Sequence, residues 1–319
     1  MKSAEVKPIE WIEPEQLNKN PAIRSRGLLA SKWCKKEPDD ISRTVSYMTL
    51  DEHKSFVREI TSKLNIELKG VGAEIGAGAS VLSNSIARIF PQVTRIYAIE
   101  IVPEMACLLQ PKIISHNGNT DRIQPVIGSF DEIKIPDSSL DFVVEFDSLH
   151  HSGDLNKTLC ELSRVLKVGG KLVAFDRAQP NEMTDEQLRY LLSIEYSSEF
   201  KKTYNIPVDE RFTRAQNGEH EPRVREWILG LKNAGFQVEG ITIFTKRTFR
   251  GFLKAAAAQI PFSIRSRLGW GEGLTASRKI LLYYFFPFLG KFLKIQELDS
   301  IFKTPGAPTG KTIIFAVKK

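Results

Sequence analysis

The chain has 319 residues, 42% of them hydrophobic, so it can bury a sizeable core in one large domain or two smaller ones. Three widely spaced cysteines form no CxxC pair, which argues against a disulfide framework and a zinc site, and we predict no bound metal. The net charge of +7 is uneven, because residues 246–319 hold fourteen Lys and Arg against three Asp and Glu, or +11, and the remainder carries −4. That asymmetry predicts either an anionic partner for the C-terminal part or a solvated basic face without a partner.

Residues 1–66 are expected to form an N-terminal arm followed by one helix. Little regular structure is expected over the first 45 residues, because four prolines interrupt them: Pro8, Pro14, Pro21 and Pro38. Residues 50–65 then repeat apolar side chains at helical spacing, and Asp51 is expected to start this helix. The first residues lack the apolar run of a signal peptide, which predicts a cytoplasmic protein.

Residues 67–245 alternate between short apolar runs and amphipathic stretches. The runs expected to be strands are VGAEIG, TRIYAIE, IQPVIG, LDFVVEF, KLVAFD and FQVEGITIF. Helical patterns lie between them, at 81–90, 103–110, 154–167, 184–202 and 221–236. Continuous apolar strands that alternate with helices are typical of a parallel sheet covered on both faces, so we predict a doubly wound α/β core.

A long insertion, residues 246–310, separates this core from a final strand at 311–319. Its run ILLYYFFPFLG is shorter than the ~20 apolar residues that a transmembrane helix needs, and Pro287 interrupts it. Basic residues surround the run: Arg265, Arg267, Arg278, Lys279, Lys291 and Lys294. Three interpretations stay open, namely a lid over an apolar substrate pocket, a device that contacts an anionic membrane surface, and a buried helical subdomain or dimer contact.

The stretch AEIGAGAS, residues 73–80, has the strand, GxG turn and helix order of a nucleotide-binding loop. Dinucleotide enzymes usually have a third glycine, but Val81 stands there, which lowers the odds of NAD or FAD. Glu100 ends the next strand, 22 residues after Gly78, where a carboxylate can accept hydrogen bonds from ribose hydroxyls. This arrangement suits either a dinucleotide or S-adenosylmethionine.

Residues 128–176 decide between them. Their IPD turn, their LHH segment after an apolar strand, and RVLKVGGKLV follow AEIGAGAS and YAIE in order, and together these motifs strongly resemble the class I S-adenosylmethionine-dependent methyltransferases. The likeness covers roughly residues 70–178 and is greatest for small-molecule enzymes such as those of quinone biosynthesis. It implies a Rossmann-like, seven-stranded, mostly parallel sheet whose last strand is antiparallel, with helical additions at the N-terminus and between the last two strands.

The resemblance also implies which residues hold S-adenosylmethionine. The glycines would face its methionine part and Glu100 its ribose, while one of three residues after the third strand would border adenine. The full set of expected cofactor-binding residues is Glu74, Gly76, Ala77, Gly78, Glu100, Ile101, Ser129, Phe130, Asp131, Phe146 and Asp147. The family commonly has an acid directly after the glycine of the third strand, whereas here Ser129 and Phe130 precede Asp131.

Three histidines are candidates for a general base. His150 and His151 follow the fourth strand, at the edge where ligands bind in open α/β sheets, and the alternative is that they only shape the pocket. His220 stands between two carboxylates in NGEHEPRVREW, which is either a loop over the active site or an exposed polar loop.

The sequence therefore predicts a methyltransferase that O-methylates a small molecule or sugar in a biosynthetic pathway. The acceptor is a free, phosphorylated or lipid-linked molecule. Peripheral contact of the protein with an anionic membrane is one possibility. The alternatives are carbon methylation of a membrane-borne quinone or lipid, and a non-catalytic protein that binds S-adenosylmethionine or a partner. No nucleic-acid-binding module is recognisable, so no nucleic acid partner is expected.

Overall fold

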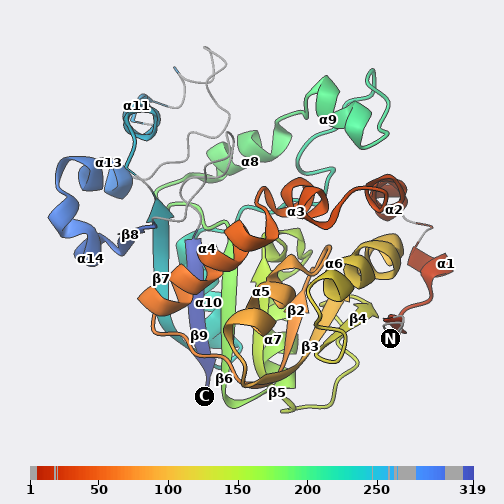
Figure 1. The fold of residues 1–319 in the computed structure, drawn as a ribbon. Helices are drawn as coiled ribbons and strands as arrows, with labels where there is room; N and C mark the ends of the chain where they lie inside the picture. The colour runs from red at the N-terminus through yellow and green to blue at the C-terminus, as the bar shows by residue number, and fades with distance from the viewer. Residues whose placement is uncertain are drawn as a thin grey trace.

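Nine strands form one sheet in the computed structural model, which describes residues 6–17, 19, 21–245, 247–257, 259–261, 264, 278–298 and 312–319 (Figure 1). The strands are β1 Ile9–Glu10, β2 Gly70–Ile75, β3 Val93–Glu100, β4 Ile123–Ile127, β5 Leu140–Phe146, β6 Leu166–Asp176, β7 Phe236–Thr245, β8 Ile295–Glu297 and β9 Thr312–Lys318. Their order across the sheet is β1-β4-β3-β2-β5-β6-β9-β7-β8. Neighbouring strands pair in parallel except for β9, which is antiparallel to both β6 and β7.

The expected α/β sheet with an antiparallel last strand is confirmed, but its expected size of seven strands is wrong. The arm adds β1 at one side of the sheet, where Ile9 pairs with Val126 of β4. The 246–310 segment adds β8 at the other side, where Ile295 pairs with Ile243 of β7. Both additions are three residues or shorter, too short for an apolar pattern to reveal them.

Helices cover both faces of the sheet, and others lie beyond the ends of its strands (Figure 1). They are α1 Pro14–Leu17, α2 Pro21–Trp33, α3 Pro38–Ser46, α4 Leu50–Lys63, α5 Val81–Ile89, α6 Gln110–His116, α7 Leu155–Val165, α8 Asp185–Ser193, α9 Ser198–Thr203, α10 Val224–Asn233, α11 Phe249–Ala257, α13 Arg278–Phe285 and α14 Gly290–Leu293. Short π or 3-10 turns are η1 Met105–Leu109, η2 Leu149–His151 and η3 Pro287–Leu289. The pattern expected as one helix at 184–202 forms two, α8 and α9, because Ser197 caps a new helix.

The core has one layer on each side of the sheet. Phe56 of α4 and Leu82 of α5 pack with Phe142 of β5 on one side. Leu162 of α7 and Trp227 of α10 pack with the alternate strand residues on the other. Because successive strand residues point to opposite faces, these apolar strands are buried on both sides, as a doubly wound sheet requires.

The N-terminal arm is more regular than expected. Three of the four prolines begin helices, namely Pro14 in α1, Pro21 in α2 and Pro38 in α3. Proline is favoured at the first helical position, because its missing N–H would have no partner there and its φ is already helical. The following helix α4 starts two residues earlier than expected, because Thr49 rather than Asp51 caps it.

The carboxyl edge, as we call the edge where β2 to β7 end, carries most of the additions. β7 runs parallel to β6, because both are antiparallel to β9, so α11 follows β7 at this edge. The segment 177–223, which includes α8 and α9, follows β6 at the same edge (Figure 1). In the described part of the chain, no helix has the length and apolar content that crossing a bilayer demands.

Candidate active site

The loop between β2 and α5 has the backbone conformation that its glycines predict. Gly76 has φ +58°, and a Cβ there would lie 2.4 Å from the Cβ of Ser148 at the end of β5. Gly78 has φ +50°, and nothing lies within 4 Å of the position its Cβ would take. Gly76 is thus required by close packing inside the protein, whereas the space in front of Gly78 is open.

Glu100 lies beside this loop at the end of β3. Its Oε2 accepts a hydrogen bond from the N–H of Gly78 at 2.7 Å, and its Oε1 accepts one from Val102 at 2.8 Å. Burial raises the pKa of this carboxyl, and the two backbone bonds oppose that rise. Ile101, the next residue, is 37% exposed, and its expected contact with the cofactor stays a prediction.

Hydrogen bonds to β3 and α6 also hold the loop between β2 and α5 in place. The N–H of Ala77 donates to the carbonyl of Ile99 at 2.9 Å, and the side-chain amide of Gln110 donates to the carbonyl of Gly78 at 3.1 Å. Glu74 is buried and accepts hydrogen bonds from the backbone and hydroxyl of Ser83 in the first turn of α5. Burial raises the pKa of Glu74 to about 8. Its observed bonds therefore anchor α5, and its expected contact with the cofactor stays a prediction.

The three residues expected near adenine lie after β4 at the carboxyl edge. Ser129 Oγ accepts a hydrogen bond from the N–H of Asp131 at 3.1 Å. The carboxylate of Asp131 accepts one from the hydroxyl of Thr158 on α7. Phe130 is half-buried against the core layer of α7 and α10. The segment is thus held by α7, and which of the three residues borders adenine stays open.

The end of β5 carries Phe146 and Asp147. The Phe146 ring packs against His53 of α4, with ring centroids 5.2 Å apart, and against Phe175 of β6 at 5.9 Å. Asp147 has φ +59°, and its Oδ1 lies 3.7 Å from Nε of Arg177. A left-handed conformation at a non-glycine residue is uncommon, and here it marks the turn from β5 into the histidine segment.

The two histidines that follow have different surroundings. His150 is 2% exposed, and its Nδ1 lies 2.7 Å from Oδ1 of Asp176, which is fully buried at the end of β6. The other oxygen of Asp176 accepts the backbone N–H of His150 at 2.9 Å. Because Phe146 pairs with Phe175 across the two strands, the residues that follow each strand meet at the carboxyl edge. We call His150 and Asp176 the His–Asp pair.

His151 is only partly buried, and its Nδ1 lies 3.2 Å from the carbonyl of Gly218. Burial, with His150 and Arg26 nearby, lowers the pKa of His151 to about 4. The His150 and His151 rings lie with centroids 4.3 Å apart. His151 is thus neutral near pH 7, where it can accept a proton only weakly.

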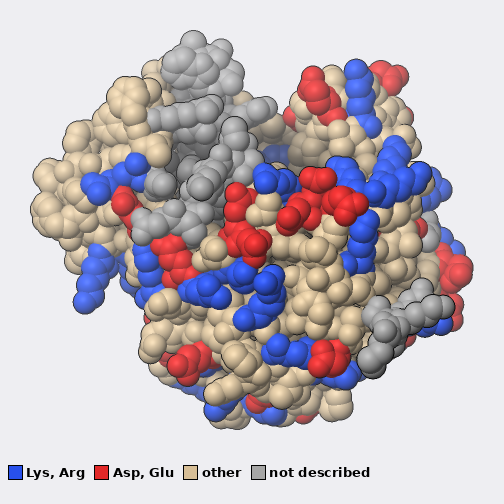
Figure 2. All heavy atoms as spheres, in the orientation of Figure 1, with Lys and Arg blue, Asp and Glu red and all other residues tan. Residues whose placement is uncertain are grey.

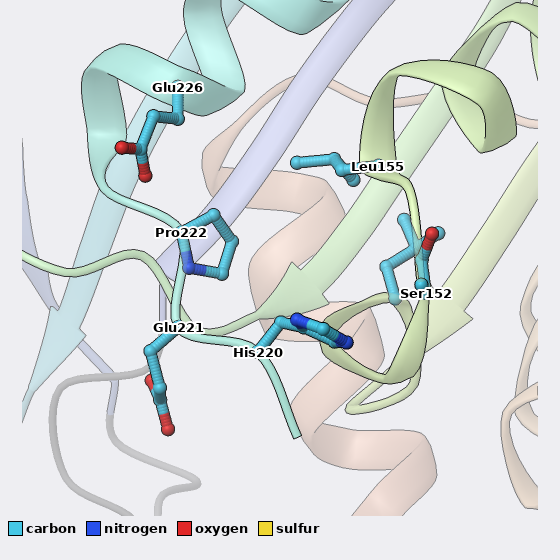
Figure 3. A pocket seen from close by; sticks show the side chains of 8 residues that line it. Ser152, Leu155, His220, Glu221, Pro222 and Glu226 are labelled. Atoms are coloured by element: carbon cyan, nitrogen blue, oxygen red, sulfur yellow. The ribbon is translucent and has the colours of Figure 1, made fainter. Parts of the chain in front are cut away.

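His220 lies beside the segment that carries His150 and His151. Its backbone N–H donates to the carbonyl of His150 at 2.7 Å, and its side chain is exposed. It lines a shallow pocket of about 240 Å³ between the starts of α7 and α10 (Figure 3). Leu149, Ser152 and Pro222 line it too, whereas neither the Gly76–Gly78 loop nor Glu100 is among its described lining residues.

Next to the His–Asp pair lies a network of charges that the sequence did not reveal, in which Glu219 and Glu221 are buried and the two arginines are partly buried. Arg177 donates to Glu219 at 2.5 Å and to Glu221 at 3.1 Å, and Arg214 bonds the same two carboxylates. Burial alone would raise the pKa of Glu219, but the two arginines lower it to about 2. Tyr196 donates its hydroxyl to Glu219. We call these five residues the cap network.

The N-terminal arm is tied to the same segment. Arg26 of α2 donates to the side chain of Asn217 at 3.0 Å, and the Ser25 hydroxyl donates to the carbonyl of Tyr204. Segments that are almost 180 residues apart in sequence therefore meet above the carboxyl edge. Only long-range folding brings them together, so local sequence patterns could not find this contact.

Three of these side chains also have the composition of a metal-ligand set. One ligand atom from each of Asp147, His150 and Asp176 lies within 4.8 Å of the others. Arg177 is close to Asp147, however, and a guanidinium supplies the positive charge that a cation would bring.

The comparisons with known proteins agree with this geometry. Residues 73–174 match a family model described as a methyltransferase domain. The chain is 22% identical over 145 residues to demethylmenaquinone methyltransferase of Oceanobacillus iheyensis, which covers 46% of this chain and 60% of that protein. It is 20% identical over 192 residues to the Bacillus licheniformis enzyme of the same name, covering 60% of this chain and 81% of that one.

A solved structure shares the fold. The [4+2]-cyclase SpnF superposes with a TM-score of 0.52 at 14% identity, over 98% of this chain and 97% of that one. The fold, the strand-loop-helix motif with Glu100, and the matched family model agree on one family. Residues 73–174 are therefore a methyltransferase domain of the S-adenosylmethionine-dependent type.

Proposed function

We propose that this methyltransferase transfers the methyl group to a hydroxyl oxygen of a small molecule or sugar in a biosynthetic pathway, and that the His–Asp pair acts as its base. The observation that carries the proposal is the 2.7 Å contact between His150 and the buried Asp176 at the carboxyl edge. A hydroxyl is a weak nucleophile until its proton is removed, whereas a neutral amine needs no base before it attacks.

The residues around the loop fit S-adenosylmethionine. The open space at Gly78 admits a ligand close to the backbone, and Glu100 brings a carboxylate to the same place. Gly76, Ala77 and Gly78 would line the methionine part, Glu100 would accept hydrogen bonds from the ribose, and Ile101 would pack on adenine. When bound, this cofactor supplies an electrophilic methyl group.

The chemistry of the His–Asp pair follows from its geometry. A carboxylate beside Nδ1 holds the proton on that nitrogen, so that the other ring nitrogen, Nε2, is the one able to accept a proton. Asp176 also accepts the N–H of Arg177 at 2.6 Å, so it is held in place by two backbone donors besides the ring. The pair therefore keeps one tautomer and one orientation, and Asp176 stabilises the imidazolium formed when His150 takes the hydroxyl proton.

The cap network would define the acceptor side of the site. Its Glu219 carries a charge at neutral pH, and Arg177 and Arg214 neutralise it. Because these charges are paired with one another, the network leaves few free charges to bind an anionic group. We therefore expect an acceptor recognised by hydrogen bonds and apolar contact, with any phosphate or lipid group lying outside the network.

Carbon methylation of a quinone or lipid is the second candidate, because two relatives are named demethylmenaquinone methyltransferases. The same base serves it, since removing a phenolic proton makes the adjacent ring carbon nucleophilic. The third candidate is cofactor binding without methyl transfer. It is favoured by the shared fold of a protein described as a [4+2]-cyclase.

Locating the methylated atom separates these candidates. The enzyme is incubated with S-adenosylmethionine that carries a ¹³C methyl group and with a panel of phenols, sugars and hydroquinones, and the products are examined by NMR. A methyl carbon bonded to oxygen supports the proposal, and one bonded to a ring carbon supports the second candidate. Tight cofactor binding without labelled product for any hydroxylated acceptor in the panel contradicts both and favours the third.

A further inference from the structure

A lobe made by residues 247–257 and 278–298 follows β7 at the carboxyl edge. It has its own small core, in which Tyr283, Leu293 and Ile295 are buried. Six apolar side chains of the lobe lie outside that core with between 45% and 85% of their surface exposed: Phe249, Leu253, Phe285, Phe286, Phe288 and Phe292. We call them the phenylalanine face.

The side chains of the face come from α11, α13, η3 and α14, and Phe286 lies between α13 and η3. The Phe285 ring of α13 packs against Phe252 of α11, with centroids 5.4 Å apart in an edge-to-face arrangement. Phe286 lies 6.0 Å from Phe288 of η3, again edge to face. Gly251 makes the approach of α11 and α13 possible, because a Cβ there would lie 2.1 Å from the hydroxyl of Tyr284. Two large apolar side chains next in the chain, Phe288 and Phe292, remain 79% and 85% exposed.

The lobe that carries this face is basic. Arg278 and Lys279 are exposed at the start of α13, and Lys291 and Lys294 are exposed in and after α14. Glu297 is the acidic residue of the described part of the lobe, and it is paired with Arg247. Figure 2 shows the lobe over α11, α13 and α14 as largely uncharged, with Lys and Arg side chains along its lower border.

We propose that the phenylalanine face docks this enzyme on the surface of an anionic lipid membrane. Exposed aromatic side chains flanked by lysines combine the two forces that hold a protein at such an interface, which are burial of apolar surface and attraction to anionic headgroups. A second copy of the chain is disfavoured as the occupant, because two faces with the same charge would repel each other. Since the lobe lies at the carboxyl edge, docking would bring the site to the lipid surface.

Co-sedimentation of the full chain with vesicles tests this proposal. We expect binding to vesicles of phosphatidylcholine and phosphatidylglycerol, no binding to phosphatidylcholine alone, and release at high salt. The double variant Phe288→Ser with Phe292→Ser should lose about tenfold or more in vesicle affinity, because both side chains are exposed and can insert. The double variant Lys279→Gln with Lys291→Gln should bind anionic vesicles more weakly, and its binding should depend less on salt concentration.

Matched controls lie at the opposite edge of the sheet. Val168→Ser removes an apolar side chain that is 75% exposed near the start of β6, and Lys232→Gln removes an exposed charge at the end of α10. Both should bind vesicles as the native chain does, and unchanged affinity for S-adenosylmethionine shows that each variant is folded. Equal vesicle binding by the double phenylalanine variant overturns the proposal. The proposal is also overturned if the native chain does not bind vesicles and instead forms a dimer, seen by sedimentation, that the double phenylalanine variant abolishes. The assay needs no acceptor, so its outcome is independent of the proposed reaction.

Discussion

The proposed role of the His–Asp pair predicts a large loss of turnover when either of its residues is changed. If His150 is the base, His150→Gln and Asp176→Asn should each lower kcat by about 10²- to 10⁴-fold, while the affinity for S-adenosylmethionine stays within about twofold. His220→Gln is the matched control, because that side chain is exposed and lines a different pocket. The rates are measured with the acceptor identified from the labelled-methyl experiment. Unchanged turnover in His150→Gln would remove the pair from the mechanism.

His151 predicts how stability depends on pH. Its folded pKa of about 4 lies below the unfolded value of about 6.5, because burial disfavours the charged ring. The unfolded chain therefore binds a proton that the folded one does not between these values, and stability is lost as pH falls from 6.5 towards 4. Because the ring is only partly buried, we expect a loss of about 1 to 2 kcal/mol. Urea unfolding of the native chain and His151→Gln should show this extra loss in the native chain alone, and parallel curves would contradict it.

The sequence located part of this chemistry. Asp147, His150 and His151 follow an apolar strand, so the rule that ligands bind beyond strand ends pointed to them. Asp176 also ends an apolar run and was open to the same argument. Its pairing with His150 depends on the register of β5 against β6, however, which a single sequence does not contain.

At the scale of elements, the loop after β2 separates packing from binding. Gly76→Ala should destabilise the fold by about 2 to 4 kcal/mol, because it combines a positive φ with a Cβ 2.4 Å from Ser148. Gly78→Ala should cost about 1 kcal/mol, because only the backbone conformation is unfavourable, yet it should weaken S-adenosylmethionine binding about tenfold. Thermal unfolding and calorimetry test the pair. Equal effects of both changes on stability would contradict this division.

The arm and the cap form a second coupled unit. Arg26→Ala removes a hydrogen bond to Asn217, and we expect faster hydrogen exchange in both 21–33 and 198–218. Arg24→Ala, on the same helix, is the control, because its side chain is exposed. Mass spectrometry of exchanged peptides measures the effect. Exchange that rises only in the arm would mean that Arg26 does not hold the cap.

Some boundaries of these elements were readable and were missed. The sequence Thr49-Leu50-Asp51-Glu52 contains a capping box, and Thr49 and Glu52 do bond each other's backbone N–H groups. The prolines of the arm read as interruptions, although they also suit first helical positions. All six expected strands of the core are confirmed, because apolar runs of this length leave a strong signal.

At the scale of the whole molecule, the structure shows where the basic residues of the C-terminal part lie. The described basic residues at 278–294 lie in the lobe at the carboxyl edge, whereas Arg265 and Arg267 lie outside the described residues. The segment with the cap follows β6 and the lobe follows β7, and only the sheet topology shows that both leave the sheet at the same edge. The sequence left three interpretations of the insertion open for that reason. The exposed phenylalanines favour the membrane-surface interpretation over the buried one.

Binding of S-adenosylmethionine beside Gly78 and Glu100 is the claim on which the remainder depends. Isothermal titration calorimetry with S-adenosylmethionine, S-adenosylhomocysteine and NAD, on the native chain and on Glu100→Gln, tests it most directly. We predict that the first two ligands bind, that NAD does not, and that Glu100→Gln weakens binding about tenfold or more, because an amide accepts fewer hydrogen bonds than a carboxylate. Binding of NAD in place of both ligands, or equal affinity in Glu100→Gln, would contradict the account of this site.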